Sequence, residues 1–362
     1  MSYNWSASIT RLLKSLSGSK RIDKIPFVPM VGEDTICRVS GKTTKELLDS
    51  PELYAKAAIM TYEFLQSDIV SIPTAYTGPA EALAFAEVNG KADSISWYDY
   101  KIFMIQQGAV CKTKSDVENL KIPEHHKCNL WRNLLEAAKI VQEETKFPQN
   151  CVLGLWCVVQ ELRGIQAYRD MRRDPDLLMK LCEKVYESLM ELYYYSVDVL
   201  GKPNFITIAG YSFNSHMMSF EDAMKFEGDF IKRLQEEIKI PFILHNCGIA
   251  PYFEEVCKEI EFLGVNGSHP LDIKYWIEFQ KKFPKVSILG ANIDVSREIL
   301  NGTQQDVEEK VKENILNLAP NGRYLCSPVC SIPWGVSLPN IMAVPKAIEK
   351  YGKEPFKLKK NQ

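Results

Sequence analysis

The chain has 362 residues, of which 44 are Lys or Arg and 46 are Asp or Glu, so its formal net charge is −2. Hydrophobic residues make up 46% and charged residues 25%, which is typical of a soluble globular protein and excludes a disordered chain. The charge balance is also unlike that of a dedicated nucleic-acid binder, which is usually basic. The length suits one large domain such as an α/β barrel.

Targeting signals are not found in the sequence. Apolar stretches stay short of the roughly 18 residues that a membrane helix needs, and residues 1–21 lack the apolar core of a secretory signal. We therefore expect a cytoplasmic protein without membrane or nucleic-acid partners. Ten Cys is a high count for such a protein, and we expect buried free thiols rather than disulfides.

Short apolar runs recur along the chain after an amphipathic helix over residues 5–16, which we expect to lie across the bottom of the fold. Each run is bounded by Gly, Pro, Asn or Asp and has the composition of a buried strand. The runs cover residues 26–31, 68–72, 151–156, 205–208, 241–245, 262–265, 286–289 and 323–326.

Helix signals fill the spaces between these runs. Expected helices follow the residues Thr43, Asp174, Ser219 and Thr303, and the last three helices end near Gly201, Lys239 and Leu318. Eight strands, nearly all followed by helices, predict an α/β fold in which residues 1–362 form a single (β/α)8 TIM barrel. An open doubly wound sheet is the alternative, but its usual glycine-rich phosphate turn does not occur in the sequence.

Residues 84–127 interrupt the alternation between the second and third strands. We interpret them as an inserted subdomain near the barrel mouth, with a hairpin turn at residues 88–91. His125 and His126 lie in a polar stretch flanked by Lys, and we expect no role for either.

The strongest group of potential metal ligands lies at the end of the fifth predicted strand, where the sequence reads His245-Asn246-Cys247. Because side chains alternate along a strand, His245 and Cys247 point the same way. Cys330 follows the eighth strand, which lies across the mouth of a closed barrel from the fifth. One imidazole and two thiolates, with a fourth position open, form a catalytic zinc arrangement.

Alternatives stay open for these ligands. A lone His-x-Cys pair is a weak motif, because a Cys at a strand end is usually only packed. Cys326 competes with Cys330, although its place within the eighth strand would also suit filling of the barrel interior. Glu81 follows the second strand and is either a fourth zinc ligand or an acidic residue favoured by a helix N-terminus.

Aromatic residues gather at the ends of the predicted strands. They would either pack the loops or form an apolar pocket suited to a flat ring, with an amide from Asn214 adding a hydrogen bond. The candidate substrate-binding residues are Trp156, Tyr211, Phe213, Asn214 and Trp334.

Several segments resemble the uroporphyrinogen decarboxylase superfamily, and within it the branch of zinc-dependent corrinoid methyltransferases. Residues 243–248 match its His-x-Cys-Gly strand, and residues 330–341 resemble its late Cys followed by a Pro-rich turn. Supporting segments are residues 78–83, 161–164 and 290–294. The branch includes methylcobamide:coenzyme M methyltransferases and the methyltransferase I components of O-demethylases.

This resemblance implies a catalytic Zn²⁺ on His245, Cys247 and Cys330. It also implies a corrinoid carried by a separate partner protein, since the chain has no Asp-x-His-x-x-Gly segment of the kind that binds one. Porphyrinogen decarboxylases hold substrate carboxylates with an Arg-rich loop after the first strand. The corresponding residues 30–38 are acidic here, which argues against decarboxylation of a porphyrinogen.

The function expected from these features is transfer of a methyl group from a small O-methyl substrate, an aryl methyl ether, to the cobalt of the partner's corrinoid. Transfer from a methylcorrinoid to a thiol of the coenzyme M type is the main alternative. A lyase related to the decarboxylases and a barrel that binds a ligand without catalysis are further alternatives.

Overall fold

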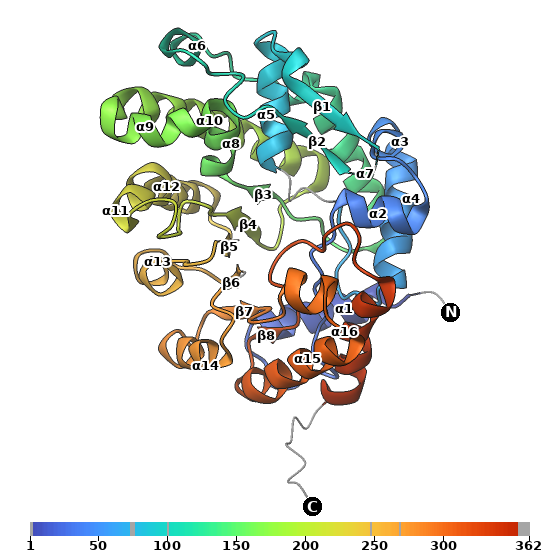
Figure 1. The fold of residues 1–362 in the computed structure, drawn as a ribbon. Helices are drawn as coiled ribbons and strands as arrows, with labels where there is room; N and C mark the ends of the chain where they lie inside the picture. The colour runs from blue at the N-terminus through green and yellow to red at the C-terminus, as the bar shows by residue number, and fades with distance from the viewer. Residues whose placement is uncertain (1–2, 73–76, 100, 247, 268, 354–362) are drawn as a thin grey trace, which may run out of the picture.

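The computed structural model describes residues 3–72, 77–99, 101–246, 248–267 and 269–353. At its centre lies a parallel sheet of six strands in the order β3-β4-β5-β6-β7-β8, surrounded by helices (Figure 1). The strands are β3 (Val152–Leu153), β4 (Ile206–Ala209), β5 (Phe242–Asn246), β6 (Gly264–Gly267), β7 (Ser287–Leu289) and β8 (Tyr324–Leu325).

Two extended segments, residues 25–31 and 68–72, close this sheet into a barrel. Val28 N donates to Cys326 O (2.8 Å) beside β8, and Asp68 N donates to Phe27 O (2.7 Å) in the neighbouring segment. The Gln149 side chain joins the second segment to the chain leading into β3, because its amide nitrogen donates to Val70 O at 3.0 Å. The predicted α/β fold of the (β/α)8 barrel type is thus confirmed.

Helices form the outer layer of the barrel. Those of the first half are α1 (Trp5–Leu16), α2 (Glu33–Ser40), α3 (Thr44–Asp49), α4 (Pro51–Phe64), α5 (Thr77–Val88), α6 (Lys114–Glu118), α7 (Asn129–Thr145), α8 (Leu155–Arg163) and α9 (Ile165–Arg173). Those of the second half are α10 (Pro175–Leu200), α11 (Phe220–Ala223), α12 (Asp229–Ile238), α13 (Phe253–Glu259), α14 (Ile273–Lys282), α15 (Gln304–Leu318) and α16 (Leu338–Tyr351).

Helix boundaries follow the capping signals in the sequence. The Asp174 side chain accepts from Leu177 N at the start of α10, and the helix ends at Gly201, whose φ of 81° is unfavourable for other residues. Thr303 caps α15 in the same way. The helix expected after Ser219 is present, although it contains a π-helical turn, η3 (Met224–Gly228), between α11 and α12.

Two local predictions are wrong. The sequence predicts Leu155 and Trp156 in the third strand, but β3 ends at Leu153 and α8 begins at Leu155. Residues 88–91 do not form a hairpin turn, because they terminate α5, with Gly90 at a φ of 67°. The hairpin of this region lies further along, between β1 (Ile95–Tyr98) and β2 (Lys101–Ile105).

Helix α1 covers the amino-terminal end of the barrel, as expected. Arg11 forms ion pairs with Asp68 and Asp23, and the Asp68 carboxylate also accepts from Phe27 N (2.8 Å), which lies in the first barrel segment. At the other end of the helix, Arg323 donates to Leu16 O (2.6 Å). These contacts fix α1 against both sides of the barrel.

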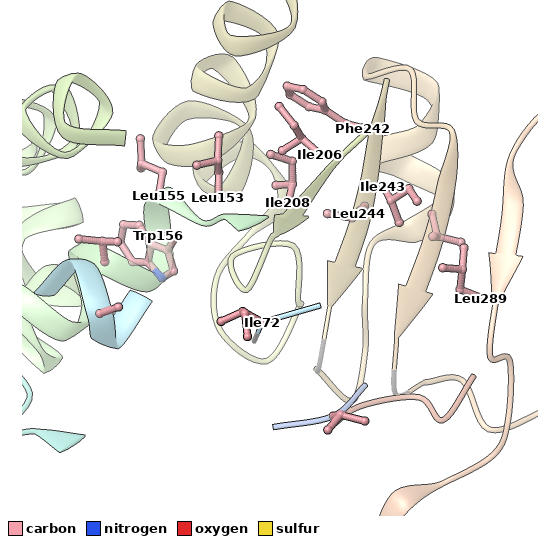
Figure 2. Close-up of a cluster of buried hydrophobic side chains, with 14 of the residues drawn as sticks. Ile72, Leu153, Leu155, Trp156, Ile206, Ile208, Phe242, Ile243, Leu244 and Leu289 are labelled. Atoms are coloured by element: carbon pink, nitrogen blue, oxygen red, sulfur yellow. The ribbon is translucent and has the colours of Figure 1, made fainter. Parts of the chain in front are cut away.

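Side chains of the strands alternate between the helical layer and the barrel interior. Leu153, Ile206 and Ile208 are buried together against the helices (Figure 2). Cys182 is a fully buried thiol outside any disulfide, as predicted. In the described ranges, every helix is too short or too polar to cross a bilayer.

Candidate active site

A cavity of about 800 Å³ occupies the barrel interior and reaches the carboxyl ends of the strands. His245, Asn266, Cys330, Tyr211 and Glu161 line its upper part. Catalytic groups of barrel enzymes are placed at this end of the strands, because the βα loops meet there. The cavity is therefore the candidate active site.

His245 is held in one orientation by the neighbouring strand. It lies opposite Asn266 in the register of β5 and β6, and its Nδ1 lies 2.6 Å from Asn266 Oδ1. Asn266 Nδ2 donates to Leu289 O (2.8 Å), which identifies Oδ1 as the acceptor. His245 Nδ1 is then the protonated nitrogen, and Nε2 carries the lone pair that a metal or a proton would use.

Cys330 lines the same cavity as His245, on the loop after β8. Backbone hydrogen bonds fix this loop, since Val329 N donates to Ile293 O (3.1 Å) and Ile332 N donates to Met30 O (3.0 Å). Cys326, the competing candidate, is fully buried in the wall, where burial raises the pKa of its thiol to about 12. The structure thus brings Cys330 to the cavity and leaves Cys326 in the core.

Cys247, the third predicted ligand, lies outside the described residues. Its neighbours are fixed, because Asn246 Nδ2 donates to Gly210 O (2.7 Å) and Gly248 N donates to Asn246 Oδ1 (2.7 Å). A Cβ at position 248 would lie 1.3 Å from Asn214 Nδ2, so only Gly fits there. Within the described ranges, no three His, Cys, Asp or Glu side chains are grouped to hold a metal.

The structure does not bring Glu81 to the cavity, contrary to its predicted role as a fourth ligand. Its buried carboxylate lies between the helices, where Trp131 Nε1 donates to it at 3.1 Å and Ser188 also donates to it. His125 Nε2 lies 2.9 Å from Glu81 Oε2. These three partners occupy the acceptor positions that a metal would need.

His125 is fully buried, although the sequence suggested that it had no role. Burial alone would lower the pKa of this imidazole, but hydrogen bonds to Glu81 and Glu191 outweigh that effect and raise the pKa. The polar residues around His125 in the sequence did not indicate this burial, because its partners Glu81 and Glu191 lie on helices that are distant in sequence. His125 therefore has a structural role in joining η2 (His125–Lys127) to α5 and α10.

The aromatic residues expected to surround the substrate divide into two groups. Tyr211 lines the cavity and is 40% exposed. Trp156 and Phe213 are buried in the core, where the Trp156 ring packs edge-on against Tyr168 with centroids 5.5 Å apart. The predicted substrate contacts of Trp156 and Phe213 are therefore not supported by their positions.

The remaining two substrate candidates lie on the loops around the cavity rather than in its wall. Trp334 is 42% exposed on the loop after β8. Asn214 is buried and its Oδ1 accepts from His216 N at 3.0 Å, which places the amide in a turn. Asn214 therefore supports the loop geometry beside Gly248.

Several cavity residues were missed in the sequence. Asn266 follows the strand predicted over residues 262–265, and its pairing with His245 becomes visible only once the strand register is known. Gln107 and Glu161 also line the cavity, and Gln107 Nε2 donates to Glu161 Oε1 at 3.3 Å. Burial raises the pKa of the Glu161 carboxyl.

Glu33, directly after the first barrel segment, is a further buried acid. Tyr54 donates to its Oε1 at 3.0 Å, and its Oε2 has no hydrogen-bond partner among the described residues. Burial raises the pKa of Glu33 to about 8, so the carboxyl is protonated at neutral pH. The acidic loop noted in the sequence thus presents a neutral group rather than a negative charge at this position.

Comparison with known proteins identifies related sequences and folds. The family model named Uroporphyrinogen decarboxylase (URO-D) matches residues 7–351. Two uroporphyrinogen decarboxylases, from Helicobacter pylori (strain Shi470) and Helicobacter acinonychis (strain Sheeba), are 25% identical over 173 residues and 26% identical over 122 residues. The matches cover 43% and 31% of this chain but only 49% and 35% of those relatives.

A solved structure of a methyltransferase from Methanosarcina mazei has the same fold. The two structures superpose with a TM-score of 0.75 at 20% identity, over 95% of this chain and 98% of that chain. The agreement therefore extends over nearly the whole of both chains.

Proposed function

The chain belongs to the uroporphyrinogen decarboxylase family, and from that premise we propose that it is a zinc-dependent methyltransferase. Its substrate would be an aryl methyl ether, and the methyl group would pass to the cobalt of a corrinoid on a partner protein. The observation that carries the proposal is the cavity that both His245 and Cys330 line, in which no described lining residue is Lys or Arg.

The donor atoms fit zinc. An imidazole Nε2 and a thiol are ligands that zinc prefers, and His245 is already oriented by Asn266. His245, Cys247 and Cys330 would hold the ion in the upper part of the cavity. Bound there, zinc would polarise the ether oxygen and stabilise the phenolate that remains after the methyl group has left.

The chain's own residues would supply orientation and a water-poor environment. Asn266 keeps the imidazole in one tautomer, since its carbonyl oxygen accepts from His245 Nδ1. Enclosure of the reacting oxygen in the cavity would exclude water and so strengthen electrostatic interactions there. Tyr211 stands at the exposed end of the cavity, where the methyl group would face the partner.

The charge of the cavity supports an ether over an anionic substrate. A porphyrinogen carries many carboxylates, and coenzyme M carries a sulfonate, so both would need cationic partners. Among the described residues that line the cavity, Glu161 is the one Asp, Glu, Lys or Arg residue. This composition favours O-demethylation over the related lyase and over the thiol acceptor.

The test is an anaerobic assay with two arms, one in which methoxybenzene is offered to a reduced corrinoid protein and one in which coenzyme M is offered to a methylated corrinoid protein. We expect methylation of the corrinoid by methoxybenzene, and its loss in Cys330→Ala. Cys257→Ala is the matched control, because that half-buried thiol lies on α13 away from the cavity. Transfer to coenzyme M alone would replace our proposal by the thiol methyltransferase, and equal activity of both variants would contradict the site.

A further inference from the structure

The barrel interior below His245 is unusually open. TIM barrels are normally filled by layers of bulky branched side chains from alternate strand positions. Here the inward positions Val152 and Thr207 are partly exposed, while their outward neighbours Leu153, Ile206 and Ile208 are buried. Inward side chains that remain exposed inside a closed barrel must border an unfilled space.

The strand register shows which row of inward side chains leaves the barrel interior unfilled. The cross-strand pairs Val152↔Thr207, Thr207↔Ile243, Ile243↔Gly264 and Gly264↔Ser287 form one continuous row, two residues below the row of His245. The row includes one residue without a side chain and two with short hydroxyl-bearing side chains. It cannot fill the barrel, so the cavity continues below the candidate metal ligands.

The lower end of the cavity is largely apolar, with the amide of Asn150 before β3 as a polar exception, and α1 lies across it. Leu12 and Leu16 of α1 line it together with Phe147 and Phe205. The hydroxyl of Ser287 donates to Leu16 O (3.2 Å), which attaches the helix directly to the barrel strands. Together with the ion pairs of Arg11, this contact fixes α1, which forms the floor of the cavity, against the barrel.

We propose that this lower chamber, bordered by Val152, Thr207, Ile243 and the floor residues Leu12 and Leu16, binds an elongated apolar group of the substrate. The oxygen would lie beside His245 and Cys330, the apolar body would point down toward α1, and the methyl group would face the mouth. The proposal narrows the substrate class to aryl methyl ethers with an apolar para substituent. It rests on the proposed function for the position of the ether oxygen.

The depth of the chamber sets the length of that substituent. Phe205 precedes Ala209, the register partner of His245, by four residues. Four residues of strand span about 13 Å, or about 11 Å along the barrel axis at a strand tilt of about 36°. A phenyl ring with a chain of roughly four to six carbons fits this length, given C–C bonds near 1.5 Å.

Binding of product analogues tests the chamber without any methyl transfer. The probes are phenol, 4-ethylphenol, 4-butylphenol and 4-hexylphenol, titrated into the full chain by calorimetry. Each methylene that enters an apolar site contributes a gain of about fourfold in affinity. We expect such a gain per methylene up to the length of the chamber, and no further gain beyond it.

Thr207→Phe fills the chamber and should remove the chain-length gain while phenol binding persists. Thr207→Val is the matched control, because it changes the polarity of the side chain but hardly its volume. Val28→Phe, on the opposite wall, provides a second filling variant if Thr207→Phe does not fold.

The outcomes are decisive in both directions. Equal affinity for phenol and 4-hexylphenol, or a chain-length gain that survives in the filled variants, would overturn the chamber. A gain that is lost in the filled variants and kept in Thr207→Val supports it. Because no corrinoid or transfer is involved, an inactive enzyme that shows this pattern would contradict the proposed function and leave the chamber standing.

Discussion

His245 and Asn266 face each other across β5 and β6, and their side chains meet through a single hydrogen bond of 2.6 Å between Nδ1 and Oδ1. The amide nitrogen of Asn266 is engaged by Leu289 O (2.8 Å), so this carboxamide cannot reverse without losing both contacts. A neighbour that fixes a histidine in this way sets which ring nitrogen binds a ligand. Asn266 is therefore a positioning residue for the proposed metal ligand.

Removing this support should weaken metal binding. We expect Asn266→Ala to lower zinc affinity about 10- to 100-fold, as measured by competition with a chelator. Asn266→Asp retains an acceptor for His245 Nδ1 and should recover part of the affinity. Wild-type affinity in Asn266→Ala would show that the imidazole needs no orientation by this residue.

The Glu81 network should matter for stability rather than for metal binding. Glu81→Ala removes the buried carboxylate partner of His125 and leaves it only the half-exposed Glu191, and breaking such a buried pair costs about 3–5 kcal/mol. Urea unfolding measures this cost, and zinc analysis of the folded variant should give the wild-type content. A folded Glu81→Ala protein that has lost its metal would restore Glu81 as a ligand.

Glu33 should make the stability depend on pH. Its pKa is raised by burial from 4.5 to about 8, so between these values the unfolded chain loses a proton that the folded chain keeps. The contribution of Glu33 to the free energy of unfolding is therefore greatest below pH 4.5. It falls by up to about 1.4 kcal/mol per pH unit until about pH 8. Glu33→Gln removes this titration.

Urea unfolding of both proteins at several pH values between 5 and 8 measures the effect. We expect the wild type to lose stability relative to Glu33→Gln as the pH rises, with little further change above about pH 8. Parallel profiles of the two proteins would contradict the protonated state of Glu33.

The two tryptophans near the mouth should behave differently. Trp156 is fully buried, so Trp156→Ala should destabilise the fold by about 3–5 kcal/mol. Trp334 is 42% exposed, and Trp334→Ala should change stability by less than about 1 kcal/mol while raising the KM for the proposed corrinoid partner. Thermal unfolding and transfer kinetics separate these effects, and a large loss of stability in Trp334→Ala would place that ring in the core.

Local signals in the sequence were sufficient to predict most of the fold. The run over residues 5–16 and the caps at Asp174 and Thr303 coincide with α1, α10 and α15, because capping and amphipathic spacing act within one helix. The boundary at Trp156 was wrong because a short strand and the first turn of a helix carry the same apolar composition.

The site could be predicted in part. The sequence indicated that His245 and Cys330 share one end of the barrel, because His245 ends one recognisable strand and Cys330 follows another, and both line one cavity. The position of Glu81 and the partnership of His245 with Asn266 depend on which helix faces or strand positions are neighbours. Such pairings between distant segments leave no periodic signal in a single sequence.

Metal analysis of the purified protein tests the central claim most directly. We predict about one zinc ion per chain in the wild type and in Cys257→Ala, and loss of the metal in His245→Ala and in Cys330→Ala, with all four proteins folded. A wild-type protein that takes up no zinc, or variants at His245 and Cys330 that keep it fully, would contradict the assignment of this cavity as a zinc site.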